Sequence, residues 1–149
     1  MTSPDSSQIL AGQLRELVGL YLARQRRHAH EQGLAQTDRL LMLLHRHGAV
    51  SQTEFGRLAG LDKSWVSRIV ERYAEDGLVE RRPLESDRRC IELHLTPSGA
   101  EKALAIDRVL TAHAEAFFGT LPASTHENLR QALGLILEAL QQRDPQEAL

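Results

Sequence analysis

The stretch from Ser51 to Gly99 constrains the fold of this chain more than any other segment. Within it, residues 61–77 predict one amphipathic helix, because its apolar side chains fall in one narrow sector at 100° per residue. These side chains are Val66, Ile69, Val70 and Tyr73. The opposite sector carries serines, arginines and glutamates, which suits hydrogen bonding to phosphates and base edges in a DNA major groove. An ordinary solvated surface helix has the same two faces, so the neighbouring segments must decide between these interpretations.

A short helix is predicted immediately before residues 61–77. Ser51 and Glu54 form a capping-box pattern at its start, and Gly60 is expected to end it. Asp62 is then the expected N-cap of the following helix. Two capped helices joined by a tight glycine-containing turn are typical of a helix-turn-helix.

Two segments after Gly77 predict a β-hairpin with a charged tip. Residues 78–84 alternate weakly between apolar and polar side chains, and residues 91–95 alternate cleanly. The segment 81–89 contains four arginines and two acidic residues, although the net charge of the whole chain is −2. Any DNA binding must therefore come from this local patch rather than from the global charge.

Long helices are expected on both sides of this core. Leucines at helical spacing predict a first helix over residues 8–30, followed by a leucine-rich helix over residues 36–47 that ends at Gly48. Thr96 and Pro97 resemble an N-cap and N1 pair that begins a helix reaching Phe118. A last helix is predicted over residues 125–143, with Ser124 and Glu127 as its capping box. The predicted fold class is mainly α with a small two-stranded β wing.

These elements define the predicted domain organisation. We expect a winged helix-turn-helix domain over residues 34–95, a helical dimerisation region over residues 8–33 and 96–143, and flexible ends at 1–7 and 144–149. The apolar faces of the end helices are larger than a small winged core can cover, which favours a homodimer with two-fold symmetry. Such a dimer would place two DNA-reading helices about one DNA turn, ~34 Å, apart.

Composition narrows the class of protein. With 149 residues, 42% hydrophobic and 26% charged, the chain has the length and composition of a single globular domain. Its apolar runs are too short to span a bilayer, and its polar start lacks the pattern of a signal peptide. A single cysteine excludes an internal disulfide and fits a reducing compartment. We therefore expect a cytoplasmic protein with no membrane partner.

Two local patterns resemble the MarR family of bacterial transcription regulators. LAGLDKSWVSRIVERYAEDGLVERR is similar to that family's recognition helix running into the first wing strand, and DRRCIELHLTPSG is similar to its wing signature. The resemblance covers residues 34–143 and is strongest over 51–99. It implies a homodimeric repressor that binds double-stranded DNA at a pseudo-palindromic operator and responds to a small, often phenolic or otherwise amphipathic effector.

The resemblance also implies DNA contacts on the recognition helix. Ser64, Ser67 and Arg68 would lie at its start, facing base edges and phosphates, and Arg72 would lie further along on the backbone side. Trp65 occupies a boundary position about 100° from the centre of the buried sector. We expect it to pack against the preceding helix, with contact to a thymine methyl group or a sugar as the alternative.

In the wing, the resemblance assigns Arg89 to the DNA minor groove. Asp87 would orient the Arg89 guanidinium through a salt bridge, and Arg88 would contact a phosphate. Cys90 is interpreted as a small apolar residue at the start of a wing strand. An oxidation-sensitive thiol with a pKa lowered by the neighbouring arginines is the alternative.

Candidate effector-binding residues come from the first, second and fifth helices: Arg24, His28, His45 and His113. The histidines also suggest a zinc-responsive regulator, but the His-x-His pairs on helices do not direct both imidazoles to one point, and no cysteine joins them. We therefore predict no metal site and no cofactor. Nucleotide-binding, nucleophile-elbow and metalloprotease motifs are absent from the sequence, so we do not expect an enzyme. A winged helix that binds protein instead of an operator is the remaining alternative.

Overall fold

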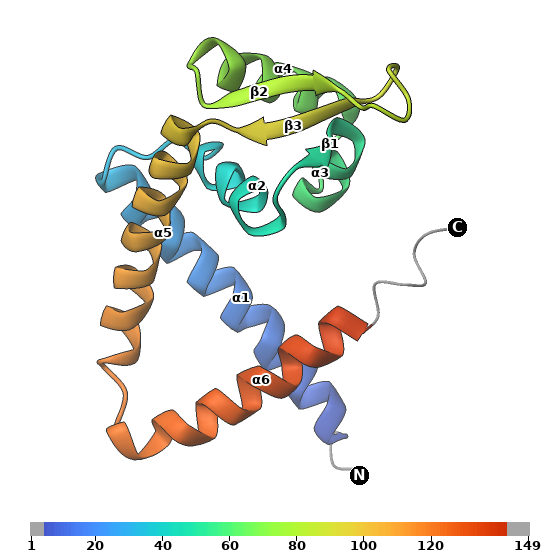
Figure 1. The fold of residues 1–149 in the computed structure, drawn as a ribbon. Coiled ribbons are helices and arrows are strands. Elements are labelled where there is room, and N and C mark those ends of the chain that lie inside the picture. The colour runs from blue at the N-terminus through green and yellow to red at the C-terminus, as the bar shows by residue number, and fades with distance from the viewer. Residues whose placement is uncertain (1–4, 143–149) are drawn as a thin grey trace. The chain divides into compact units, whose positions relative to one another are not determined.

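The computed structural model describes residues 5–142 and consists of two compact units, one reaching Thr111 and one starting at Ala112 (Figure 1). The first unit contains α1 (Ser6–Glu31), η1 (Asp38–Leu40), α2 (Leu41–His47), β1 (Val50–Ser51), α3 (Gln52–Ala59), α4 (Lys63–Glu75), β2 (Val79–Pro83), β3 (Ile91–Leu95) and most of α5 (Pro97–Phe118). The second unit contains the end of α5, η2 (Ala123–Thr125) and α6 (His126–Gln142). No helix among residues 5–142 is long and apolar enough to cross a membrane.

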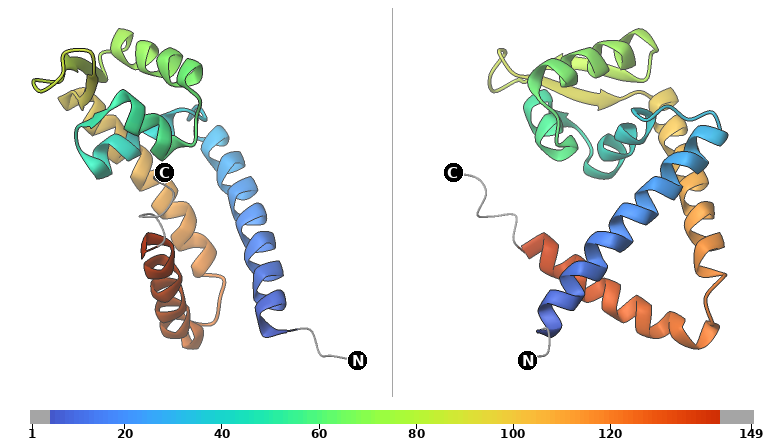
Figure 2. Two further views of the ribbon diagram at one scale, coloured as in Figure 1. Left: turned by 90° about the vertical axis from the view of Figure 1, so that its right-hand side faces the viewer. Right: turned by 180° about the vertical axis from the view of Figure 1, so that it is seen from behind.

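The sheet has three strands rather than the predicted two. Its order is β1–β3–β2, and both pairings are antiparallel. The β2–β3 hairpin is the predicted wing, and β1 pairs with the other edge of β3, with Val50 opposite Leu93. A strand of two residues is too short to show an alternating pattern, which explains why the sequence did not reveal it. Helices α2, α3 and α4 lie close to this sheet in both further views of the chain (Figure 2).

Most predicted helix caps in the winged region are confirmed. The Asp62 carboxylate accepts hydrogen bonds from the amides of Ser64 and Trp65 at 2.9 and 3.0 Å, and thereby starts α4. Thr96 accepts from the amide of Gly99 at 3.0 Å at the start of α5. Ser51 caps α3, but Glu54 does not complete the capping box, because its carboxylate binds the Arg57 guanidinium instead.

The remaining differences from prediction lie at helix ends. Helix α1 begins at Ser6, two residues earlier than predicted, so residues 6 and 7 are helical rather than flexible. The predicted helix over 36–47 starts as a 3₁₀ turn at Asp38, and α6 follows another such turn. The predicted capping box before α6 does not form, because Glu127 binds Arg130 and Gln131. The predicted flexible residues 1–4 and 144–149 lie outside the described residues, as does residue 143 at the end of the predicted last helix.

One apolar core holds the winged region together. The predicted buried face of α4 is confirmed, since Val66, Ile69, Val70 and Tyr73 are between 1 and 7% exposed. These side chains pack with Leu41 and Leu44 of α2, Phe55 of α3, Leu93 of β3, and Ala103 and Ile106 of α5. Because this core fixes one side of α4, the other side of the helix is held facing solvent.

Polar contacts join α4 and α5 to the connector between α1 and α2. The buried Tyr73 hydroxyl of α4 donates a hydrogen bond to the carbonyl of Thr37. In the same connector, Asp38 accepts from the amide of Ala35 at 2.9 Å and pairs with Lys102 of α5 at 3.1 Å. Burial raises the pKa of Tyr73, with the Asp38 charge as the second cause. The phenol therefore stays neutral and able to donate.

Replacing Tyr73 by phenylalanine is expected to lower the free energy of unfolding by about 1 kcal/mol, because the hydrogen bond to the carbonyl of the half-buried Thr37 is lost. The wild-type phenol ionises more readily in the unfolded chain, so its contribution is fully present below its ordinary pKa of about 10 and is lost as pH rises above that value. Urea unfolding at pH 7 and at pH 10.5 tests both statements. Equal stability of the two proteins at pH 7 would contradict a contribution from this hydrogen bond.

Candidate nucleic-acid interface

The exposed face of α4 carries every recognition-helix residue named from the sequence. Ser64, Trp65, Ser67, Arg68 and Arg72 are all exposed, whereas the opposite face of the helix is buried. The first two turns of α4 carry Lys63 and Arg68, whereas Glu71 and Glu75 lie further along and Arg72 approaches Asp76 at 3.9 Å. The Asp62 carboxylate at the N-cap is the acidic group at this end of the helix.

Both serines on this face are held by a neighbouring side chain. The Ser64 hydroxyl donates to the Asp62 carboxylate at 2.8 Å. The Ser67 hydroxyl accepts from the amide nitrogen of Gln52, at the start of α3, at 3.3 Å. Hydrogen bonds from the Trp65 amide and from Ser64 lower the pKa of Asp62, so it remains a carboxylate at neutral pH.

Trp65 is more exposed than the expected packing against the preceding helix would leave it. Its side chain is 53% exposed, and the Arg68 guanidinium lies 5.8 Å from the centre of its ring. This distance is within the range of a cation–π interaction. The indole ring therefore contacts the Arg68 guanidinium, and more than half of the Trp65 side-chain surface stays accessible on the same face of α4.

The wing does not contain the predicted salt bridge between Asp87 and Arg89. Among the described residues, the Asp87 carboxylate pairs with no guanidinium and accepts instead from the backbone amide of Arg89 at 3.0 Å. Its second oxygen lies 3.7 Å from the Cys90 sulfur, and its carbonyl accepts from the Cys90 amide at 2.9 Å. Asp87 thus closes the turn at the tip of the wing by binding the backbone. The Arg88 and Arg89 side chains are exposed.

A groove brings the wing, α3 and the start of α4 together. It has a volume of about 680 Å³, and its lining includes Arg57 of α3, Lys63 of α4, and Arg89 and Cys90 of the wing. Arg57 is ion-paired with Glu54 at 2.7 Å, so Lys63 and Arg89 supply most of the positive charge. Sequence reasoning missed Gln52 and Arg57, because their proximity to the recognition face depends on how α3 packs against α4. It also missed Lys63, which the helix register alone places at the start of α4.

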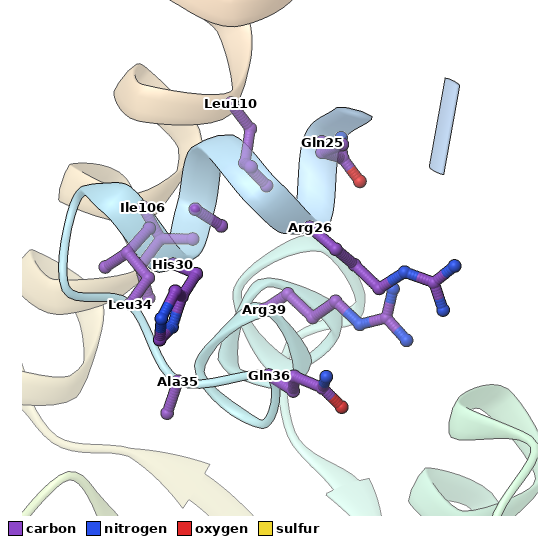
Figure 3. A pocket seen from close by; sticks show the side chains of 10 residues that line it. Gln25, Arg26, His30, Leu34, Ala35, Gln36, Arg39, Ile106 and Leu110 are labelled. Atoms are coloured by element: carbon purple, nitrogen blue, oxygen red, sulfur yellow. The ribbon is translucent and has the colours of Figure 1, made fainter. Parts of the chain in front are cut away.

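A second hollow lies where α1, the connector and α5 meet (Figure 3). Its volume is about 210 Å³, and it is lined by Gln25, Arg26, Ala29, His30, Leu34, Ala35, Gln36, Arg39, Ile106 and Leu110. Figure 3 shows the Arg26 and Arg39 side chains extending to the same side, away from the aliphatic wall formed by Leu34, Ile106 and Leu110. Neither guanidinium has an acidic partner within residues 5–142. The hollow therefore combines an apolar wall with two unpaired positive charges.

None of the four predicted effector-binding residues lines this hollow. Arg24 and His28 lie on α1 beside the lining positions, and His45 is exposed near the end of α2. His113 belongs to the second unit. The neighbouring positions Arg26 and His30 face the hollow instead, a difference of two residues, or about 200° around a helix. In the part of the chain that the structure describes, no three His, Cys, Asp or Glu side chains are grouped closely enough to hold a metal ion.

Comparison with known proteins agrees with this geometry. The sequence model of the MarR family matches residues 38–91, from η1 to the start of β3. The match includes the helix-turn-helix formed by α3 and α4 and the first wing strand β2. No curated protein matches the sequence.

Solved structures of similar fold cover most of the chain. Wild-type MarR from E. coli without ligand is 19% identical with a TM-score of 0.72, over 83% of this chain and 96% of that one. AbsC, a MarR family transcriptional regulator from Streptomyces coelicolor, is 22% identical with a TM-score of 0.67, over 96% and 99%. NadR in complex with 4-hydroxyphenylacetate is 20% identical with a TM-score of 0.63, over 91% and 95%. At these identities the structures show a shared fold.

Proposed function

We propose that this protein is a MarR-type transcription regulator that acts in the cytoplasm and binds a pseudo-palindromic operator as a homodimer. The observation that carries the proposal is a groove lined both by Arg89 of the wing and by Lys63 at the start of α4. Next to it, the same helix presents Ser64, Ser67 and Arg68 to solvent. A helix with hydroxyls and a guanidinium suits the major groove, while an arginine on an adjacent hairpin suits the minor groove.

The end helices support a dimer. Helix α1 exposes an apolar stripe on which Leu10, Leu14 and Leu17 are 64, 44 and 50% exposed. In the second unit, α6 exposes a stripe of its own that includes Leu133, Ile136, Leu137 and Leu140. Exposed apolar stripes of this length are typical of surfaces buried against a partner. A second copy of the chain satisfies this requirement and also supplies the second recognition helix that a palindrome needs.

The hollow beside α1 is the proposed effector site. Arg26 and Arg39 provide two positive charges at its edge, and Leu34, Ile106 and Leu110 provide an aliphatic wall. These features suit a small amphipathic carboxylate, since guanidinium groups bind carboxylates and the wall can cover a ring. The related fold of NadR holds 4-hydroxyphenylacetate. We propose that such a ligand releases a repressor from DNA by favouring a conformation with lower operator affinity.

Footprinting on the DNA that flanks the gene tests the proposal. The purified full-length protein is expected to protect an inverted repeat whose half-sites are about one helical turn apart. Repeating the footprint with a panel of aromatic carboxylates, including 4-hydroxyphenylacetate, tests the effector site, with Arg26→Ala as the variant expected to lose the response. Absence of a protected repeat, together with capture of a protein partner, would instead identify a protein-interaction module.

A further inference from the structure

The two serines at the start of α4 have opposite hydrogen-bonding polarity. A serine hydroxyl carries one hydrogen to donate and two lone pairs to accept with. Ser64 already donates its hydrogen to the Asp62 carboxylate at 2.8 Å, so only its lone pairs remain for a ligand. Ser67 accepts from Gln52 at 3.3 Å, and its hydrogen has no acceptor among the described residues. Ser67 therefore faces solvent as a donor.

We propose that Gln52 is a specificity-determining residue that holds Ser67 as a hydrogen-bond donor to a base edge, while Asp62 holds Ser64 as an acceptor. The inference rests on the proposed DNA-binding function. Ser67 would read a major-groove acceptor such as purine N7, guanine O6 or thymine O4. Ser64 would read an amino group, either N4 of cytosine or N6 of adenine.

The surroundings of each serine support this division. The Asp62 carboxylate beside Ser64 repels phosphate and attracts amino groups, because it remains ionised at neutral pH. Ser67 is followed along the helix by Arg68, whose guanidinium lies 5.8 Å from the centre of the Trp65 ring, and it has Lys63 and Glu71 one turn away on either side. Gln52 is the first residue of α3. Because its amide donates to the Ser67 hydroxyl from a separate helix, it limits the rotation of that hydroxyl. Gln52 is thus a positioning residue that acts through Ser67.

Selection of duplexes from a randomised pool tests the pairing of Gln52 with Ser67. Duplexes are selected separately with four proteins: the wild type, Gln52→Ala, Ser67→Ala and the double variant. The affinity of each protein for single-base variants of the wild-type motif is then measured. Gln52→Ala and Ser67→Ala are expected to lower discrimination about three- to ten-fold at the same base pair of each half-site. The double variant is expected to lose no more than either single variant, since both changes remove one contact.

Base analogues test the polarity. Duplexes with 7-deazapurine or 4-thiothymine at the Ser67 position are expected to weaken binding of the wild type but not of Ser67→Ala. Duplexes with purine for adenine or 2-pyrimidinone for cytosine are expected to weaken binding of the wild type but not of Ser64→Ala, at a different position. Ser98→Ala, an exposed serine at the start of α5 that does not line the groove, serves as the control and is expected to keep every base preference.

Two results would overturn the inference while leaving DNA binding intact. One is a Gln52→Ala protein with wild-type preferences at every position, and the other is an exchange of the two analogue responses between the serines. A wild type that enriches no motif would instead refute the proposed function itself. Circular dichroism and melting temperature of each variant show that a changed preference does not come from a changed fold.

Discussion

Replacing Arg89 by alanine is expected to weaken operator binding about ten-fold or more at ~150 mM salt. Its side chain is exposed at the end of the wing and lines the groove with Lys63, so no element of the fold depends on its guanidinium. The Asp87 carboxylate holds the backbone amide of Arg89 rather than its side chain, so the wing turn stays closed in the variant. The loss should therefore come from contact with DNA alone.

The matched control for Arg89 is Arg108→Ala, which removes an equal charge from an exposed position on α5. Fluorescence anisotropy with the footprinted operator and with a random duplex separates a minor-groove contact from general attraction. If Arg89 enters a narrow, A/T-rich minor groove, the substitution should weaken binding to the operator more than binding to the random duplex. If Arg89→Ala bound the operator as tightly as the wild type, Arg89 would have no role in DNA binding.

Replacing Gly99 by alanine is expected to lower the free energy of unfolding by about 3 kcal/mol. A methyl group at this buried position in α5 would lie 2.0 Å from the carbonyl oxygen of Leu78, well inside contact distance. That carbonyl accepts a hydrogen bond from the Thr96 amide at 3.0 Å, and Leu78 is itself buried, so neither partner can move away cheaply. Urea unfolding measures the loss, and the wing should lose its attachment to α5 with it.

Gly12→Ala provides the control for this substitution. It lies inside α1 with nothing within 4 Å of its added methyl group, so alanine is expected to keep or raise stability through its better helix propensity. Similar destabilisation by the two substitutions would show that close packing at Leu78 is not the cause.

Elements with strong local signals could be predicted from the sequence. The N-cap Asp62, the buried stripe of α4 and the wing strands all follow from spacing within a single segment. Strand β1 could not be predicted, because two residues carry no period. The Asp87–Arg89 contact was assigned to the wrong group, since spacing alone does not distinguish a carboxylate bound to a side chain from one bound to the backbone.

The candidate sites depended more on tertiary packing. Gln52 reaches Ser67 only because α3 crosses α4, and the two residues are 15 positions apart. Helix α1 carries basic and polar side chains on several faces, so its sequence did not show that Arg26 and His30, rather than Arg24 and His28, face the hollow. The residues that line this hollow come from three segments, and their common location is set by the core around Ile106.

The connector between α1 and α2 contributes both to the hollow and to the contacts of α4. Thr37 lies between Gln36 and Arg39, which line the hollow, and its carbonyl holds the Tyr73 hydroxyl of α4. A shift of the connector backbone would therefore move α4 or break this hydrogen bond. Ile106 provides a second link, because it lines the hollow and packs in the core against the buried face of α4. Removing the Tyr73–Thr37 hydrogen bond would leave this core as the link between the hollow and the exposed face of α4.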